Sequence, residues 1–263
     1  MTSEDVLCGK RGRAMWIRLN RPAELNALTH AMFDGCASAL DDAARDPEVM
    51  AVVVTGVGRA FCAGADLKFL QEIPQPQRDD ATNAFLHSAS DLMARLETFP
   101  KPVIAAVNGV ATAGGMELVL SCDLVIAAKS AVLGDGHANF GLLPGAGASV
   151  RLPRKIGPTR AKYLFFTGDL LPATECLAAG LVNEVVEDAE MEVAIERLVK
   201  KIASKSAIGL RRMKQLVDDG LDQPRDTAMR LELAMSALHT TSFDRNEGIA
   251  AFNEKRKPQF QGR

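Results

Sequence analysis

The stretch VIAAVNGVATAGGMELVLSCDLVIAA, residues 103–128, says more about the fold than any other part of the chain. It opens with an apolar run that ends at Asn108-Gly109, which predicts a buried strand over 103–107. A glycine-rich turn and a short apolar helix over 113–121 come next, and 123–128 is typical of another strand. This order predicts an α/β fold built from right-handed ββα or βαβ units.

The same order of elements occurs nearer the start of the chain. Residues 13–19 alternate apolar and polar side chains, and 49–54 form a continuous apolar run, so both are predicted strands. Thr29 is a suitable cap for a helix between them. The predicted apolar face of that helix is Met32, Phe33, Cys36, Leu40 and Ala44.

Residues 71–78 are rich in proline and glutamine, which predicts an exposed, mobile loop. The next segment, 80–98, is expected to be a long helix with Phe85, Leu92 and Leu96 on one face.

After residue 188 the strand patterns disappear and helical patterns cover 188–203, 206–221, 225–240 and 244–256. Their apolar stripes contain Leu198, Ile202, Leu210, Met213, Leu216, Leu231, Met235 and Leu238. We therefore expect a core over 1–190 and a C-terminal helical region over 191–263. Either this region is a plain packing layer or it also makes subunit contacts, and we prefer the second interpretation because four amphipathic helices need a surface to cover.

The composition is that of an ordinary globular protein, with 263 residues, 47% apolar residues and a net charge of -2. Without a basic stripe, neither nucleic acid nor an anionic membrane is an expected partner. The five cysteines contain no C-x-x-C pair, so we expect no disulfide framework and no metal site, and a reducing compartment such as the cytoplasm. We also find no secretory leader and no apolar run of about 18 residues that predicts a membrane span.

The segment TGVGRAFCAGADLK, residues 55–68, follows a predicted strand but lacks the third glycine of a dinucleotide-binding turn. A tight turn fits better, since the small residues Ala63, Gly64 and Ala65 let a ligand approach the backbone. Asp66 would then start a helix, and the Ala65 N–H would point into a cleft.

Ala113-Gly114-Gly115 leads directly into the short apolar helix, whose unpaired N–H groups attract developing negative charge. The alternative is a glycine turn packed against a neighbouring strand. Glu117 lies one turn into this helix, either as a carboxylate that complements the helix dipole or as an acid or base beside the N–H donors. His137 lies in the loop 134–147, where it is either a structural residue or a group that titrates near neutrality.

Five segments, taken together and in order, resemble the crotonase superfamily, that is, the enoyl-CoA hydratase/isomerase family. They are NRPAELNAL (20–28), GRAFCAGADLK (58–68), NGVATAGGMELVLSCDLVIA (108–127), FGLLPGAGASVRLPRKIG (140–157) and GIAAFNEKRKPQF (248–260). The resemblance spans nearly the whole chain. It implies the crotonase (ClpP/crotonase-like) fold of repeated ββα units, with a C-terminal helical region used in trimer contacts.

The resemblance also implies site residues. The oxyanion hole, which binds the thioester oxygen, would be the N–H groups of Ala65 and Gly114, and Glu117 would be the first catalytic glutamate. The expected substrate and CoA contacts are Ala23, Leu25, Ala63, Asp66, Leu67, Lys68, Phe252 and Lys255. Coenzyme A is part of the substrate, so no separate cofactor is expected. Members of the family are usually trimers or dimers of trimers.

One position departs from the family pattern, because hydratases typically carry a second glutamate where this chain has His137. Asp135 would replace that glutamate only if the loop were shifted by two residues. A neutral His137 would orient or deprotonate water, and the rate would then fall below its ordinary pKa of about 6.5. The predicted function is an enoyl-CoA hydratase that uses Glu117 and His137. The alternatives are an isomerase, a C–C bond hydrolase or decarboxylase of the same family, and a weakly active CoA-binding scaffold.

Overall fold

The computed structural model describes residues 4–263, apart from the side chains of Phe69 and Leu70. Its larger sheet has six strands in the order β1–β2–β3–β5–β7–β10, in which β1 and β2 are antiparallel and all other neighbours are parallel. The strands are β1 (Val6–Arg11), β2 (Ala14–Leu19), β3 (Ala51–Gly56), β5 (Val103–Val107), β7 (Leu124–Ala128) and β10 (Glu184–Val186). The central strands β3 and β5 are buried almost throughout, which explains why their sequences are continuous apolar runs.

A second sheet has four strands in the order β4–β6–β8–β9. They are β4 (Ala60–Cys62), β6 (Val110–Thr112), β8 (Val132–Gly134) and β9 (Leu171–Pro172). The long strands β3, β5 and β7 are each followed by one short strand of this sheet and then by helix, which confirms the expected ββα repeat. At the turn between β5 and β6, a Cβ on Gly109 would lie 2.1 Å from the Arg59 carbonyl oxygen, so only glycine fits there.

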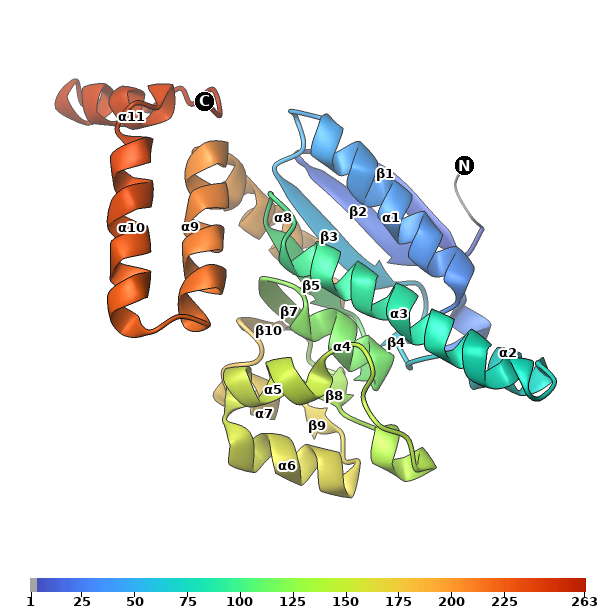
Figure 1. Ribbon diagram of the computed structural model, residues 1–263. Coiled ribbons are helices and arrows are strands. Elements are labelled where there is room, and N and C mark those ends of the chain that lie inside the picture. Colours follow the sequence, from blue (N-terminus) through green and yellow to red (C-terminus); the bar gives the residue numbers. More distant parts are fainter. Residues whose placement is uncertain (1–3) are drawn as a thin grey trace.

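Helices cover the sheets, and Figure 1 shows α1 and α3 running alongside each other across one face of the larger sheet. The helices of this body are α1 (His30–Arg45), α2 (Leu67–Glu72), α3 (Gln77–Glu97), α4 (Gly114–Leu120), α5 (Ala148–Ile156), α6 (Pro158–Thr167), α7 (Ala173–Ala178) and α8 (Met191–Ala203). Short 3-10 turns are η1 (Pro22–Glu24), η2 (His137–Phe140) and η3 (Asp188–Glu190). Helix α8 contacts β3 and β7 and so packs on the larger sheet.

Two details of the sequence prediction are wrong. Residues 71–78 do not form a loop, because α2 continues to Glu72, α3 begins at Gln77, and only 73–76 connect the helices. On α1, Ala43 is buried and Ala44 is exposed, so the apolar face is rotated by one position at its end. The start of that helix is as predicted, since the Thr29 hydroxyl accepts a hydrogen bond from the Met32 N–H.

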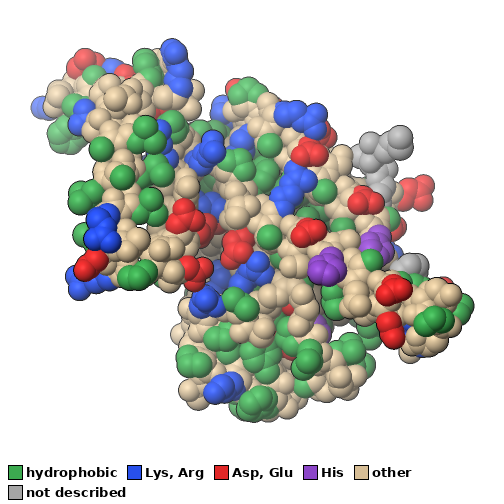
Figure 2. Space-filling model, in the orientation of Figure 1, with side chains coloured by type: hydrophobic (Ala, Val, Ile, Leu, Met, Phe, Trp, Pro, Cys, Tyr) green, Lys and Arg blue, Asp and Glu red, His purple; other side chains and the backbone are tan. Residues whose placement is uncertain are grey.

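The last three helices form an arm, residues 207–253, that stands beside the body (Figure 1). They are α9 (Ala207–Leu221), α10 (Arg225–His239) and α11 (Phe243–Asn253), and the predicted helical ranges are confirmed to within three residues. The arm carries many hydrophobic side chains on its surface (Figure 2). More than half exposed are Met213, Val217, Leu221, Met229, Leu233, Leu238 and Phe252.

Candidate active site

A cavity of about 80 Å³ lies between α3, α4 and the segment from η2 to α5. Its apolar wall consists of Phe85, Leu86, Ala89 and Met93 on α3, with Phe140 and Leu142 opposite. The rest of the lining comes from Ala63, Ala65 and Leu67 near α2, from Ala113, Gly114 and Glu117 at α4, and from His137, Gly145 and Ala146. An apolar chain can therefore lie against one side while its polar end meets backbone N–H groups and two ionisable side chains on the other.

The backbones before α2 and α4 meet at this cavity. Gly64 has φ +104°, and a Cβ placed on it would lie 3.5 Å from the Gly114 nitrogen and 3.0 Å from the Ala113 Cβ. Ala113 itself has φ 50° and ψ -120°, a strained conformation for a residue other than glycine. Across the described residues, neither the Ala65 N–H nor the Gly114 N–H donates to a protein acceptor. Two unpaired N–H groups therefore belong to adjoining loop-to-helix junctions on one cavity wall.

The glycine pair of α4 serves two purposes. A Cβ on Gly115 would lie 2.0 Å from the Cys62 carbonyl oxygen, so Gly115 is required for packing α4 against β4. Gly114 instead lines the cavity. The packing interpretation of this turn is thus correct for Gly115, and Gly114 stays a predicted oxyanion donor that lines the cavity.

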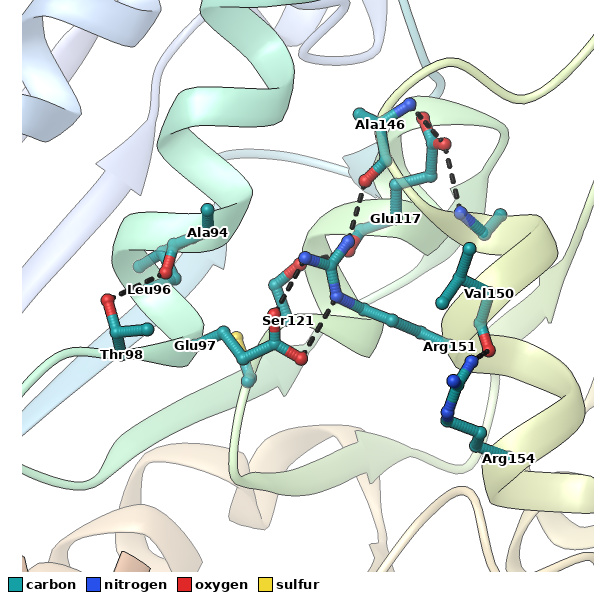
Figure 3. A network of polar contacts seen from close by, with 12 residues as sticks. Ala94, Leu96, Glu97, Thr98, Glu117, Ser121, Ala146, Val150, Arg151 and Arg154 are labelled. Carbon is teal, nitrogen blue, oxygen red and sulfur yellow. Dashed lines mark hydrogen bonds and ion pairs between the residues drawn. The ribbon is translucent and has the colours of Figure 1, made fainter. Parts of the chain in front are cut away.

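Glu117 is only 3% exposed and points from α4 toward the loop that precedes α5 (Figure 3). Its Oε1 accepts hydrogen bonds from the N–H groups of Ala146 (2.7 Å) and Ala148 (3.2 Å). No residue in the described part of the chain donates to Oε2. Burial raises the pKa of Glu117, an effect reinforced by Asp135 and opposed by the two N–H bonds and by His137. The free oxygen and the raised pKa suit a group that exchanges a proton with a bound molecule.

Arg151 on α5 holds the loop that positions Glu117. Its guanidinium donates to the Ala146 carbonyl oxygen (2.7 Å) and pairs with Glu97 at the end of α3 (2.8 Å), as Figure 3 shows. Arg151 is largely buried. Arg151 thereby joins α5 to the end of α3 and also holds Ala146, the residue whose N–H group donates to the Glu117 carboxylate.

His137 begins η2 and lines the same cavity as Glu117. Its Nδ1 lies 3.0 Å and 2.9 Å from the two carboxylate oxygens of Asp135, which is 1% exposed. Burial of the ring acts against its charged form, but the hydrogen bond and charge of Asp135, with the charge of Glu117, outweigh it and raise the pKa of His137. The pKa of His137 is therefore higher than the ordinary value that the sequence prediction assumed.

Of the predicted site residues, six come together around the cavity: Ala63, Ala65, Leu67, Gly114, Glu117 and His137. Asp66 lies behind the wall, where it pairs with Arg21 (2.8 Å) and accepts a hydrogen bond from the Lys68 N–H. The Lys68 side chain is exposed.

The remaining predicted contacts do not line the cavity. Ala23 and Leu25 lie in and just after η1, and the Leu25 carbonyl oxygen accepts a hydrogen bond from the Ala63 N–H. Phe252 lies in the last turn of α11 and Lys255 lies just after that helix, and both are exposed. Helix α11 is at the top of the arm, away from α4 and α5 (Figure 1). Within one copy of the chain these two residues are separated from the others.

Sequence reasoning missed two residues of the site, Asp135 and Arg151. Asp135 enters the sequence analysis only as a replacement for the missing glutamate. A carboxylate two residues before a histidine is, however, close enough in sequence to suggest that it bonds the imidazole ring. Arg151 has no such signal, because nothing local to its helix shows that it reaches Glu97 and Ala146.

Comparison with known proteins agrees with this architecture. A family model described as enoyl-CoA hydratase/isomerase matches residues 10–263. The chain is 35% identical over 261 residues to crotonyl-CoA hydratase of Syntrophomonas wolfei, covering 99% of each protein. It is 36% identical over 260 residues to 1,2-epoxyphenylacetyl-CoA isomerase of Escherichia coli, again with 99% of each covered. Among solved structures, enoyl-CoA hydratase from Bacillus anthracis superposes with a TM-score of 0.93 at 35% identity, over 98% of this chain and 100% of that one.

The fold and the sequence relationships together define a hydratase-like enzyme with the crotonase fold. The chain belongs to the enoyl-CoA hydratase/isomerase family. Across residues 4–263, no helix is both long and apolar enough to cross a membrane.

Proposed function

We propose that the chain is an enoyl-CoA hydratase that adds water across the 2,3 double bond of a short enoyl-CoA. The observation that carries this proposal is that one small cavity is lined by two ionisable side chains, Glu117 and His137, and by the junctions that present the Ala65 and Gly114 N–H groups. The two N–H groups would bind the thioester oxygen as charge develops on it, a contribution that is typically worth about 3–4 kcal/mol per donor. Glu117 and His137 would then move the protons of the added water.

Ala63 and Leu67 are proposed to contact the substrate from the cavity wall. The predicted contacts outside the cavity are proposed to hold the CoA portion: Ala23, Leu25, Asp66, Lys68, Phe252 and Lys255. The small cavity and its apolar wall favour a short acyl chain over a long one. A C–C bond hydrolase receives less support, because the turn at Pro144, Gly145 and Ala146 carries no acid. Isomerisation of an enoyl-CoA is a second candidate, since the matching family model is described as enoyl-CoA hydratase/isomerase.

A panel of acyl-CoA thioesters tests the proposal. We expect short trans-2-enoyl-CoA substrates to lose their conjugated absorbance and to gain the mass of one water, and longer chains to react more slowly. The trans-3-enoyl isomers serve as the comparison. Movement of the double bond without a gain in mass would establish an isomerase instead, and binding without turnover would establish a scaffold.

We also propose that the chain assembles as a trimer or a dimer of trimers through the arm, in the cytoplasm. The exposed apolar side chains of α9 and α10 support assembly, because contiguous apolar surface is costly to leave in water. Assembly also offers a way for Phe252 and Lys255 to reach the cavity of a neighbouring copy. All five cysteines are free, which suits a reducing compartment.

Light scattering of the purified chain is expected to give a mass three or six times that of one copy. Replacing Leu233, which is 68% exposed on α10, by aspartate should shift the population toward smaller species. The neighbouring change Glu232→Gln removes a charge from the same helix and should leave the mass unchanged. A stable monomer at micromolar concentration would contradict the proposal.

A further inference from the structure

The carboxylate of Asp135 accepts hydrogen bonds from both the backbone and the ring of His137. Its Oδ1 accepts a hydrogen bond from the His137 backbone N–H (3.2 Å), and both oxygens contact the His137 Nδ1. The loop that carries Asp135 and His137 packs closely against β6. A Cβ on Gly136 would lie only 2.6 Å from the Thr112 hydroxyl oxygen. Backbone and ring of His137 are thus held by a single buried carboxylate, which leaves the imidazole little freedom to turn.

This contact determines which ring nitrogen can act in the cavity. An ionised carboxylate only accepts hydrogen bonds, so Nδ1 must carry the proton that it shares with Asp135. The other nitrogen, Nε2, is then the one available to the cavity that His137 lines. No residue in the described part of the chain pairs with Nε2.

Charge also favours one protonation state. The charged groups that act on the ring are Asp135 from its own loop and Glu117 from α4, and both are acids. Their negative charges stabilise an imidazolium, whereas burial alone would disfavour it. The arrangement that fixes the ring therefore also favours its cationic form in the cavity that Glu117 lines.

We infer that Asp135 is a positioning residue, which holds the Nδ1–H of His137 and keeps the imidazole cationic, so that His137 is the acid and Glu117 the base of the reaction. The inference rests on the proposed hydratase function. In hydration, the Glu117 carboxylate takes a proton from water as the water oxygen bonds to C3, and the electrons of the double bond move into the thioester enolate. The Nε2–H of His137 then gives its proton to C2. Glu117 ends protonated and His137 neutral, and solvent returns both to the starting state.

Rates alone do not decide these roles. A carboxylate with an imidazolium carries the same number of protons as a carboxylic acid with a neutral imidazole, so both arrangements give the same dependence of rate on pH. NMR of ¹⁵N-labelled ring nitrogens distinguishes the two protonation arrangements directly. The protein is labelled with ¹⁵N-histidine, and the signal of His137 is identified among the four histidines as the one lost in His137→Gln.

We expect the ring of His137 in the unsubstituted protein to remain protonated on both nitrogens above pH 6.5. In Asp135→Asn the charge is lost while the side chain keeps its size, and the pKa of His137 should fall by about 1–3 pH units. The ring carries the proton that it gives to C2 below its pKa and has lost that proton above it. Turnover near pH 8 should therefore fall about tenfold or more. In a plot of rate against pH, the alkaline limb should move to lower pH by the same number of pH units as the pKa of His137.

Two matched variants complete the experiment. Asp169→Asn removes a carboxylate that bonds Tyr163, and it should leave the His137 titration unchanged. Asp135→Glu restores the charge and should recover part of the lost pKa. An unchanged His137 pKa in Asp135→Asn would overturn the inference, as would a neutral ring in the unsubstituted protein that carries its proton on Nε2. Because the NMR signals do not depend on turnover, a failure of hydration in the substrate panel is distinguishable from a failure of this inference.

Discussion

Replacing Glu117 by glutamine is expected to lower kcat for hydration by about 10³-fold, within the range for removal of a general acid or base. The amide oxygen of glutamine can still accept hydrogen bonds from the Ala146 and Ala148 N–H groups, so the loop before α5 keeps its partner. What is lost is an oxygen able to take a proton. Steady-state kinetics with crotonyl-CoA and calorimetric binding of a saturated acyl-CoA should show turnover lost and affinity retained.

The fold should not suffer from this change. Because burial raises the pKa of Glu117 in the folded chain, its stabilising contribution is present at low pH and is lost as the pH rises through that pKa. At neutral pH the ionised carboxylate is a cost that glutamine removes, so thermal stability should be unchanged or higher. Glu192→Gln, an exposed change on α8, is the control for activity. Retention of more than a tenth of the activity in Glu117→Gln would exclude the assigned role.

Removing the Gly114 N–H is expected to lower kcat by about 10²–10³-fold, the usual effect of deleting one oxyanion donor. Proline removes that N–H, and Gly114 is the first residue of α4, where proline is tolerated because the N–H has no helical partner. Alanine is the matched control, since it keeps the donor. Its Cβ would lie 3.2 Å from a Leu28 methyl carbon and 3.4 Å from the Gly64 Cα, so the wall needs only a small adjustment.

The infrared band of the bound thioester carbonyl gives a second measurement. Two donors should lower its frequency in the unsubstituted enzyme and in Gly114→Ala, and the shift should be smaller in Gly114→Pro. Circular dichroism checks the fold, because the ψ of -120° at Ala113 lies outside the range that a residue before proline prefers. Equal activity in the proline and alanine variants, both folded, would show that this N–H does not bind the oxyanion.

Much of the fold could be predicted from local sequence. The continuous apolar runs of β3 and β5 are what strands buried on both faces require, and the Thr29 cap is a contact between residues three positions apart. The loop predicted over 71–78 failed for a tertiary reason. The Arg78 side chain donates to the carbonyl oxygens of Gln71 and Ile73, which joins the ends of two helices across a proline-rich link.

The candidate site was predicted in part. The order of five motifs pointed to Ala65, Gly114, Glu117 and His137, and these residues line one cavity although up to 72 positions separate them, as the numbering shows. The residues that hold these groups in place and shift their pKa values were not predicted. Asp135 raises the pKa of His137, and Arg151 fixes the loop that holds Glu117. Both effects depend on how the folded chain orients these side chains.

By itself, the sequence determined the α/β class, the C-terminal helices and the positions of the glycines, because these depend on periodicity, caps and turns between near neighbours. The choice of a ββα repeat over βαβ units came from the family resemblance. Only the tertiary structure decided that Gly115 serves packing while Gly114 lines a cavity, and that the arm leaves its apolar side chains exposed. It also decided the burial and the neighbouring charges that raise the pKa values of Glu117 and His137. A pKa depends on burial and on charges a few ångströms away, and neither is encoded in the spacing of residues along the chain.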